Sequence, residues 1–232
     1  MRTELKGRTA VVTGAAGTMG RAVAKALAAD GLRVVGMDVK PAGGCIVCDI
    51  SDPRAVAQAL RAIGRVDVLV NNAGILSNNK AEATTPEEWR RVLAANLDGA
   101  FYLSRQVIPG MKKRRWGRIV NTCSLAAKTG GLTAGTAYAT SKGALTSLTF
   151  SLARELAPFG VTVNGISPAY VRTPMVTKQL NAAQRRSVLA QIPVGRFCEP
   201  EEFAHVVRFL VHPLAGFITG EIVDLNGGVI MD

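Results

Sequence analysis

Tyr138 and Lys142 are four residues apart in a stretch that reads as helix, so their side chains share one helix face. A free phenol, with a pKa of about 10, is a poor base and a poor acid at neutral pH, and a nearby ammonium lowers that pKa by stabilising the phenolate. The pair therefore predicts a general acid/base in which Lys142 lowers the pKa of Tyr138. A surface tyrosine and lysine at ordinary helical spacing is the alternative, because five-residue matches are common.

A glycine-rich turn near the N-terminus indicates a dinucleotide site. The apolar run 9–13 leads into G-A-A-G-T-M-G at 14–20 and then into a helical stretch. Glycines in such a turn permit positive φ and let backbone N–H groups approach a pyrophosphate at the helix N-terminus. A second apolar run, 32–37, ends on Asp38, whose carboxylate can accept hydrogen bonds from an adenosine ribose. A strand-end turn residue is the alternative for Asp38.

Further motifs follow in order, and together they resemble the short-chain dehydrogenase/reductase family over essentially the whole chain. The matching segments are the turn 13–20, Asp49, the N-N-A-G at 71–74, Asn96, the strand-end Ser124, Tyr138 with Lys142, Pro168, the T-P-M at 173–175, and the segments 217–220 and 226–228. The resemblance implies a nicotinamide-dependent enzyme whose lid over the substrate extends from about 174 to 198.

The resemblance also implies roles for individual residues. Tyr138 exchanges a proton with the substrate, and Ser124 hydrogen-bonds the substrate oxygen. Lys142 also holds the nicotinamide ribose, and Asn96 orients a proton relay to Lys142. A strand-end hydroxyl and an ordinary helix residue are the alternatives for Ser124 and Asn96. The implied cofactor-binding residues are Gly14, Gly17, Thr18, Met19, Gly20, Asp38, Asp49, Ile50, Asn72, Ala73, Gly74, Tyr138, Lys142, Pro168, Val171 and Thr173.

Three departures from the family pattern carry expectations of their own. Thr18 stands where the family has a middle glycine, and we expect it to cap free N–H groups of the helix, so that dinucleotide binding survives. Ala169 replaces the glycine that usually follows Pro168, near the nicotinamide. Only ten residues separate Asp38 from Asp49, too few for a strand-helix-strand crossover. We therefore expect a bare turn at 40–44 and an open adenosine end.

The composition, 232 residues with 48% hydrophobic, fits a soluble globular domain. The N-terminus lacks an apolar signal stretch, and no apolar run approaches the roughly 18 residues that span a bilayer, so we expect a cytoplasmic protein that binds no membrane. Cys45 and Cys48 would point to opposite faces of a strand, which favours buried thiols over a bridge or a shared metal. Without clustered Cys, His or carboxylates, no metal site is expected.

Apolar runs alternate with helical patterns along the chain, which predicts an α/β fold. A single Rossmann-type, doubly wound domain is expected over 1–232, with about seven parallel strands and helices on both faces. Helix starts are indicated at 52–53, 85–88 and 199–202, where proline and acids fall in a first turn. The predicted strands are 9–13, 32–37, 45–48, 66–70, 118–122, 161–166 and 221–225.

The formal net charge of +11 is densest in the run 112–115 with Arg118. This run lies between a helix and a strand, at the sheet edge opposite the catalytic ends of the strands. A solvated helix end is the favoured interpretation. In relatives that reduce acyl groups on carrier proteins, basic residues near this helix end help to dock the acidic carrier. Nucleic acid is not an expected partner, because Trp116 alone is interleaved with the basic residues.

The combined hypothesis is an NAD(P)-dependent oxidoreductase that interconverts a secondary alcohol and a ketone. NAD(H) is preferred because Asp38 would repel a 2′-phosphate, with Lys40 as a partial offset. The alternatives are a 3-oxoacyl-carrier-protein reductase using NADPH and a non-catalytic dinucleotide sensor. The resemblance implies a homotetramer formed through helices at 86–110 and 136–158. Lid cations favour an anionic or carrier-linked substrate, with solvated charges as the alternative; they are Arg172, Lys178, Arg185, Arg186 and Arg196.

Overall fold

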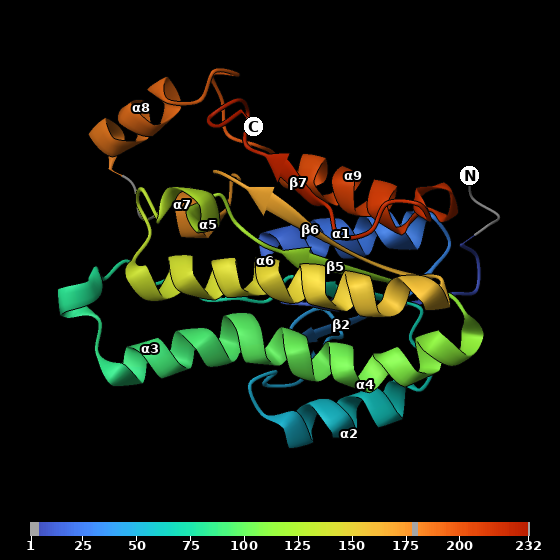
Figure 1. The fold of residues 1–232 in the computed structure, drawn as a ribbon. Helices are drawn as coiled ribbons and strands as arrows, with labels where there is room; N and C mark the ends of the chain where they lie inside the picture. The colour runs from blue at the N-terminus through green and yellow to red at the C-terminus, as the bar shows by residue number, and fades with distance from the viewer. Residues whose placement is uncertain (1–4, 178–180, 232) are drawn as a thin grey trace.

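The computed structural model describes residues 5–177 and 181–231. Within these ranges one parallel sheet has the strand order β3-β2-β1-β4-β5-β6-β7 (Figure 1). The order reverses between β1 and β4, which in open α/β sheets is the place where ligands bind, outside the carboxyl ends of the strands. The strands are β1 (Thr9–Thr13), β2 (Arg33–Asp38), β3 (Ile46–Val47), β4 (Val68–Asn71), β5 (Gly117–Thr122), β6 (Val161–Pro168) and β7 (Ile222–Leu225).

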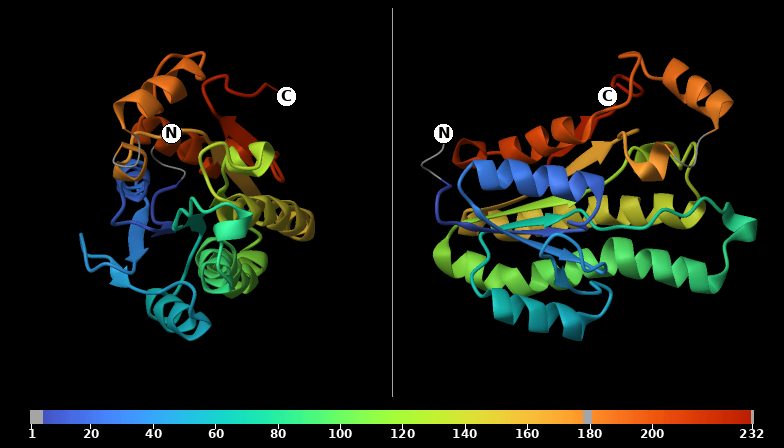
Figure 2. Two further views of the ribbon diagram at one scale, coloured as in Figure 1. Left: turned by 90° about the vertical axis from the view of Figure 1, so that its left-hand side faces the viewer. Right: turned by 180° about the vertical axis from the view of Figure 1, so that it is seen from behind.

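Helices cover both faces of the sheet, as predicted. One face is covered by α1 (Thr18–Ala29) and α9 (Pro200–Val211), and the other by α2 (Pro53–Ile63), α4 (Gly99–Arg114) and α6 (Thr136–Leu156) (Figure 2). The remaining α-helices are α3 (Pro86–Leu93), α5 (Ala126–Thr129), α7 (Pro174–Thr177) and α8 (Ala182–Ala190). Short 3₁₀ turns lie at Ala81–Ala83, Ala157–Phe159 and Pro213–Ala215, and a π-helical turn, η2 (Ala94–Asp98), joins α3 to α4.

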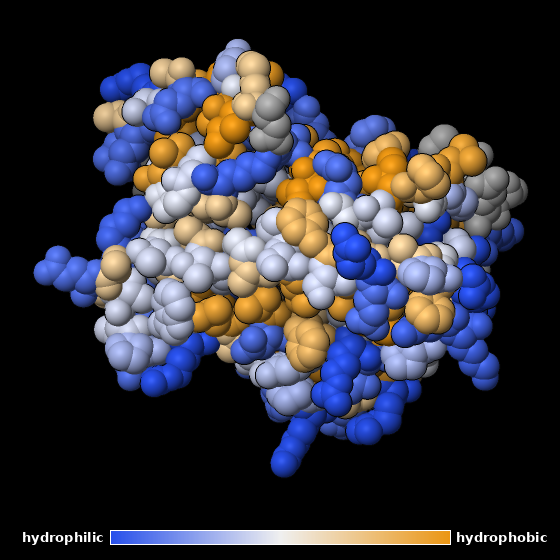
Figure 3. Space-filling model, in the orientation of Figure 1, coloured by the Kyte–Doolittle hydropathy of each residue, from blue (hydrophilic) through white to orange (hydrophobic). Residues whose placement is uncertain are grey.

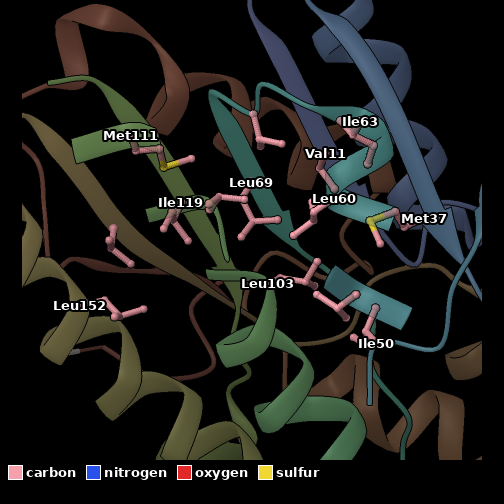
Figure 4. Packing of buried hydrophobic residues seen from close by; sticks show 14 of the residues in the cluster. Val11, Met37, Ile50, Leu60, Ile63, Leu69, Leu103, Met111, Ile119 and Leu152 are labelled. Atoms are coloured by element: carbon pink, nitrogen blue, oxygen red, sulfur yellow. The ribbon is translucent and has the colours of Figure 1, made fainter. Parts of the chain in front are cut away.

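Alternating strand residues build two cores, one on each face of the sheet. Val11, Leu69 and Ile119 pack into the cluster under α2, α4 and α6 (Figure 4). Their neighbours Val12 and Val70 pack on the other face, against α1 and α9. Strands buried on both faces are expected in a parallel sheet, which explains why these runs are continuously apolar in the sequence.

The helix starts predicted from proline and acids are found. Asp52 accepts a hydrogen bond from Arg54 N at the start of α2, and Thr85 Oγ1 accepts one from Glu88 N at the start of α3. Glu199 forms a capping box with Glu202 at the start of α9. These local contacts satisfy N–H groups that a helix cannot pair internally.

The connection between β2 and β3 contains no helix in the part of the chain that the structure describes, as the short spacing predicted. Cys45 packs on the α1 side of the sheet, and Cys48 is buried in the core on the opposite side. The placement on opposite faces is as expected, but of the two free thiols only that of Cys48 is buried, whereas Cys45 is half-buried. None of the helices formed by residues 5–177 and 181–231 is both long and apolar enough to cross a lipid bilayer.

Candidate active site

The carboxyl ends of β4, β5 and β6 open into a cavity of about 570 Å³. Ser124 lies two residues after the end of β5, while Tyr138 and Lys142 project from the first turns of α6. All three side chains line this cavity. The residues whose spacing predicted proton chemistry therefore lie together, at the edge of the sheet where the strand order predicts a ligand.

Tyr138 and Lys142 share one face of α6, as their spacing predicted. Lys142 is only 3% exposed, and its Nζ lies 5.7 Å from the centre of the Tyr138 ring. The ammonium donates a hydrogen bond of 2.7 Å to the carbonyl of Thr122 at the end of β5. Lys142 is thus held by the sheet.

The pKa of Tyr138 differs in direction from the expectation. Burial raises the pKa of Tyr138 above 10, while a hydrogen bond with Ser124 acts in the opposite direction. Burial also lowers the pKa of Lys142 to about 8. The pKa of Tyr138 is therefore not depressed in the chain itself, because the loss of water around the phenol outweighs the hydrogen bond with Ser124; the contribution of Lys142 to lowering this pKa stays a prediction.

Asn96 lies in the π-helical turn η2, a feature that frequently marks functional sites. Its Oδ1 accepts a hydrogen bond of 2.8 Å from Ile75 N, and its Nδ2 donates to Ile75 O and to Ser141 Oγ, both at 3.0 Å. A Cβ added to Gly74 would lie 3.1 Å from Asn96 Oδ1 and 3.5 Å from Lys142 Nζ. Asn96 therefore connects the segment after β4 to the helix that carries Tyr138 and Lys142.

The glycine turn at 14–20 makes close backbone approaches. Gly14 has φ of +64°, and a Cβ there would lie 2.9 Å from Ala73 Cα. A Cβ on Gly20 would overlap the Gly14 carbonyl oxygen and lie 2.8 Å from Ala15 Cα. These glycines let β1, α1 and the segment after β4 approach one another more closely than any residue with a Cβ would allow.

The start of α1 corrects the expectation for Thr18. Gly17 is the N-cap of α1 and supplies no side-chain hydrogen bond, so Thr18 stands inside the first turn and does not cap it. N–H groups at an uncapped helix start favour an anion such as a pyrophosphate. Together with the close glycine contacts, this start fits a dinucleotide, which Gly14, Gly17, Thr18, Met19 and Gly20 would hold.

Asp38 lies against the glycine turn. Its Oδ2 accepts a hydrogen bond from Ala16 N and its Oδ1 accepts one from Lys40 N, each at 3.0 Å. Thr13 makes a similar connection that the sequence analysis missed: its Oγ1 accepts hydrogen bonds from Asn72 N and Ala73 N, both at 3.0 Å. Thr13, the first residue of the glycine motif, therefore links the end of β1 to the segment that follows β4.

The predicted cofactor residues fall into two groups. Those that line the cavity beside Ser124 are Met19, Asn72, Gly74, Tyr138, Lys142, Pro168, Val171 and Thr173. The others are not among its lining residues: Gly14, Gly17, Thr18, Gly20, Asp38, Asp49, Ile50 and Ala73. Asp49 is exposed and accepts hydrogen bonds from Ser51 N and Oγ at 2.9 and 2.7 Å, whereas Ile50 packs its side chain into the core. A cofactor contact at Ile50 would therefore come from its backbone.

The segment expected to form the lid, 174–198, lies beside the cavity and carries α7 and α8. The side chains that it places on the cavity wall are Val176, Gln184, Ser187, Val188 and Gln191. Further apolar lining, which the sequence analysis did not single out, comes from Leu76, Leu125, Leu132 and Tyr170. The Tyr170 hydroxyl lies 3.4 Å from Thr133 Oγ1, so that the root of the lid meets the loop before α6.

The described arginines of the expected cationic lid do not line the Tyr138 cavity. Arg172 Nε is 2.8 Å from Glu199 Oε1, and Arg196 pairs with both oxygens of Glu202 at 2.6 and 2.7 Å. These two arginines and Arg185 line a separate cavity of about 340 Å³. Arg186 is exposed and lines neither cavity, and Lys178 lies outside the described residues. The acidic partners at the start of α9 are 27 residues from Arg172 and 6 residues from Arg196 in the sequence, and composition alone does not reveal such pairs.

The basic run lies at the opposite end of the sheet, where β5 begins, as expected. Lys113 and Arg115 are exposed. Arg118 contradicts the expectation of a solvated charge: it is 3% exposed, its guanidinium lies 4.6 Å from the Trp116 ring, and burial lowers its pKa to about 10. Among the described residues no group of three or more Cys, His, Asp or Glu is placed to hold a metal.

Comparison with known proteins assigns the family. The family model described as "Enoyl-(Acyl carrier protein) reductase" matches residues 14–230. The 3-oxoacyl-[acyl-carrier-protein] reductase FabG of Vibrio cholerae serotype O1 is 41% identical over 244 aligned positions, covering 98% of this chain and 99% of the relative. This similarity extends across both the glycine turn and the Tyr138 cavity.

Solved structures agree with the sequence relatives. A putative NAD(P) dependent gluconate 5-dehydrogenase from Beutenbergia cavernae with bound NADP superposes with a TM-score of 0.89 at 38% identity, over 97% of each chain. A 3-oxoacyl-[acyl-carrier protein] reductase from Brucella melitensis with bound NAD gives a TM-score of 0.91 at 33% identity, over 98% of this chain and 92% of that one. With the strand order, the glycine turn and the Tyr138 cavity, these matches show that the chain belongs to the short-chain dehydrogenase/reductase family of oxidoreductases, which act on CH–OH groups with NAD(P).

Proposed function

We propose that this chain reduces the ketone of a 3-oxoacyl thioester to the secondary alcohol, the narrower of the two oxidoreductase activities that the sequence suggested. One observation carries the proposal: a cavity with Ser124, Tyr138 and Lys142 on its wall and apolar side chains such as Leu76, Leu125, Leu132 and Val188 on the rest. The polar set suits a carbonyl oxygen, and the apolar wall suits an acyl chain. The 41% identity to a reductase named for such substrates supports the same conclusion.

The side chains act on the substrate oxygen. Ser124 donates a hydrogen bond that stabilises negative charge on the carbonyl oxygen, and Tyr138 donates the proton that completes the alcohol. Lys142 supplies a positive charge beside the phenol. Asn96 holds the segment after β4 against α6 through its hydrogen bonds to Ile75 and Ser141. A nicotinamide dinucleotide bound at the glycine turn supplies the hydride.

NAD(H) is the cofactor that the adenosine end favours. Asp38 is fixed beside the glycine turn by Ala16 N and would present a like charge to a 2′-phosphate. Two unit charges about 5 Å apart at an effective dielectric near 20 repel by roughly 3 kcal/mol before screening, equivalent to about a hundredfold. Lys40 is the opposing influence, since it follows in the short turn and carries a positive charge. The related structures hold NADP in one case and NAD in another.

The proposed enzyme is a single dinucleotide-binding domain over residues 1–232, in which residues 174–198 form the lid over the substrate. The net charge of +11 suits an acidic carrier protein as the bearer of the acyl group. An anionic small substrate has less support, because the described lid arginines do not line the Tyr138 cavity.

A matched substrate series tests this function. The comparison is kcat/KM for a 3-oxoacyl thioester on an acidic carrier protein, the same acyl group on a small thiol, and simple ketones of equal length, each with NADH and with NADPH. We expect the thioesters to exceed the ketones by at least about tenfold, with NADH preferred. Equal efficiency for ketones and thioesters would favour a general secondary-alcohol dehydrogenase. Tight cofactor binding without turnover of any substrate would indicate a sensor, and a preference for NADPH would overturn the role given to Asp38.

A further inference from the structure

Lys80 joins the two loops that form one side of the Tyr138 cavity. Leu76 and Asn78 line the cavity from the segment after β4, and Leu132, Thr133 and Ala134 line it from the loop before α6. Lys80 Nζ donates hydrogen bonds to the carbonyl of Gly131 at 2.8 Å and to that of Ala134 at 2.7 Å. A single ammonium therefore holds both ends of the loop 131–134.

This loop has little regular structure of its own. Gly130 and Gly131 have φ of +69° and +83°, so the backbone leaves α5 in a conformation that does not continue the helix. Leu132 and Thr133 at its tip are exposed. Lys80 is itself exposed, but hydrogen bonds from a charged donor are stronger than those between neutral groups, and its two bonds are shorter than the 3.4 Å bond from Gly131 N to Thr129 Oγ1.

The same two segments also fix the start of α6. Gly135 N donates to Ser77 O at 2.7 Å, and Thr136 N donates to Asn79 O at 3.0 Å. A Cβ on Gly135 would lie 2.7 Å from Asn79 N, so the two backbones are in direct contact. The helix that presents Tyr138 and Lys142 thus begins on the segment that carries Lys80.

Glu88 anchors that segment to α3. Its carboxylate accepts hydrogen bonds from Ser77 Oγ and, at 2.7 Å, from Asn79 Nδ2, and these contacts lower the pKa of Glu88. Thr85 at the N-cap of α3 in turn accepts a hydrogen bond from Glu88 N. Lys80 therefore extends from a fixed base to a loop whose other side-chain contacts are longer: Gly131 N donates to Thr129 Oγ1, and Thr133 Oγ1 lies opposite the Tyr170 hydroxyl, both at 3.4 Å.

We propose that Lys80 is a positioning residue for substrate binding, which holds the loop 131–134 in the shape of the cavity wall. This inference rests on the proposed function in one respect, that the acyl substrate occupies this cavity. Lys80 is outside the set of described residues that line the cavity, so its effect passes through the backbone of the loop. Loss of the ammonium should weaken substrate binding more than it slows the chemical step.

The test compares Lys80→Met with Lys80→Arg, and uses Lys25→Met, an exposed lysine of α1, as the control. We expect Lys80→Met to raise KM for a 3-oxoacyl thioester about tenfold while kcat changes less than about threefold. Amide hydrogen exchange of residues 131–136 should become about tenfold faster, with β5 unchanged. Lys80→Arg, which can still donate to both carbonyls, should restore KM and exchange to within about threefold.

Unchanged KM and unchanged exchange at 131–136 in Lys80→Met would overturn the inference. Faster exchange throughout β5 would overturn it as well, because Lys80 would then support the fold in general. A wild-type chain that turns over no 3-oxoacyl thioester would refute the proposed function instead, and the exchange of residues 131–136 would still test the role of Lys80 on its own.

Discussion

Lys142 is buried and the neighbouring Tyr138 is half-buried, and the loss of water shifts both groups towards their neutral forms. It raises the pKa of the phenol and lowers that of the ammonium to about 8. At neutral pH the phenol therefore holds the proton that reduction of a ketone requires, while Lys142 is still mostly charged. Above about pH 8 Lys142 loses its proton, and the positive charge beside the phenol is lost with it. The proposed reduction should therefore weaken above this pH.

Replacing Tyr138 with Phe keeps the ring and removes the proton donor. We expect turnover to fall by at least about a hundredfold, the usual scale for loss of a general acid. The dissociation constant of the cofactor, followed by nicotinamide fluorescence, should change little. Tyr102→Phe, on α4, is the matched control. Near-normal turnover in Tyr138→Phe would refute the assigned proton donor.

Lys142 should oppose folding at neutral pH. Its pKa is about 8 in the folded chain against an ordinary value of 10.5, so the unfolded chain binds more protons between these values. Above about pH 10.5 burial of Lys142 therefore costs no stability. As the pH falls towards about 8 and below, the unfolded chain gains a proton that the folded chain does not, and the free energy of unfolding falls. The difference of about 2.5 units corresponds to roughly 3 kcal/mol.

We accordingly expect Lys142→Met to raise the free energy of unfolding at pH 7 by up to about 3 kcal/mol, less the lost hydrogen bond to Thr122, while it abolishes efficient turnover. The gain should shrink as the pH rises from 8 towards 10.5. Urea denaturation at several pH values measures both effects. A variant that is less stable than the wild type at pH 7 would contradict the assigned cost of burying the ammonium.

At the scale of elements, the site depends on a close approach between β1, α1 and the segment that follows β4. Gly20 allows α1 to pass over the Gly14 carbonyl, and Gly14 allows Ala73 to approach the turn. The helix α6 has a different glycine: a Cβ on Gly143 would meet nothing within 4 Å. Packing therefore requires a glycine at position 20, whereas Gly143 only lowers the helix propensity of α6.

Gly20→Ala and Gly143→Ala should therefore act in opposite directions. The first forces β1 and α1 apart and should lower the free energy of unfolding by about 1 to 3 kcal/mol, with weaker dinucleotide binding. Gly143→Ala lowers the backbone entropy of the unfolded chain and should raise the free energy of unfolding by about 0.5 to 1 kcal/mol. Thermal or urea denaturation of the two variants gives the comparison. Equal effects would show that the close contact at Gly20 does not constrain the turn.

Sequence reasoning succeeded where local chemistry decides the outcome. Proline with acids set the starts of α2, α3 and α9, and the spacing between Asp38 and Asp49 excluded a helix. It failed where a partner from a distant segment decides. The helix expected at 86–110 is found as one helical run of α3, η2 and α4, but its π-helical turn around Asn96 was not foreseen, and Arg172 pairs with Glu199, 27 residues away. Lys80 gave no signal, since its acceptors are backbone carbonyls some 50 residues away.

At the scale of the whole molecule, apolar side chains remain at the surface. Phe101 on α4 and Phe150 on α6 are 41% and 49% exposed. Figure 3 shows apolar side chains gathered on the face that these two helices present. Exposed apolar patches on a globular protein commonly mark an interface. This face coincides with the helices through which the resemblance implied association.

We expect a homotetramer, with α4 and α6 of neighbouring copies in contact. Light scattering at micromolar concentration should give about four times the chain mass of 24.4 kDa. Phe150→Asp should lower that mass, since it places a charge on the apolar face, whereas a substitution at the exposed Lys25 of α1 should not. A monomeric mass for the wild-type chain would contradict the expectation.

The two-residue strand β3 also affects the behaviour of the chain at high concentration. It forms an edge of the sheet, and an exposed edge strand offers unpaired backbone groups to which a strand of another chain can add. Here the edge is Ile46–Val47 alone, preceded by Gly43 and Gly44 with positive φ, so a neighbouring chain finds room for very few ladder hydrogen bonds. The short connection therefore ends the sheet in an edge too brief to be a template for amyloid-like stacking, a hazard that a longer bare strand would carry.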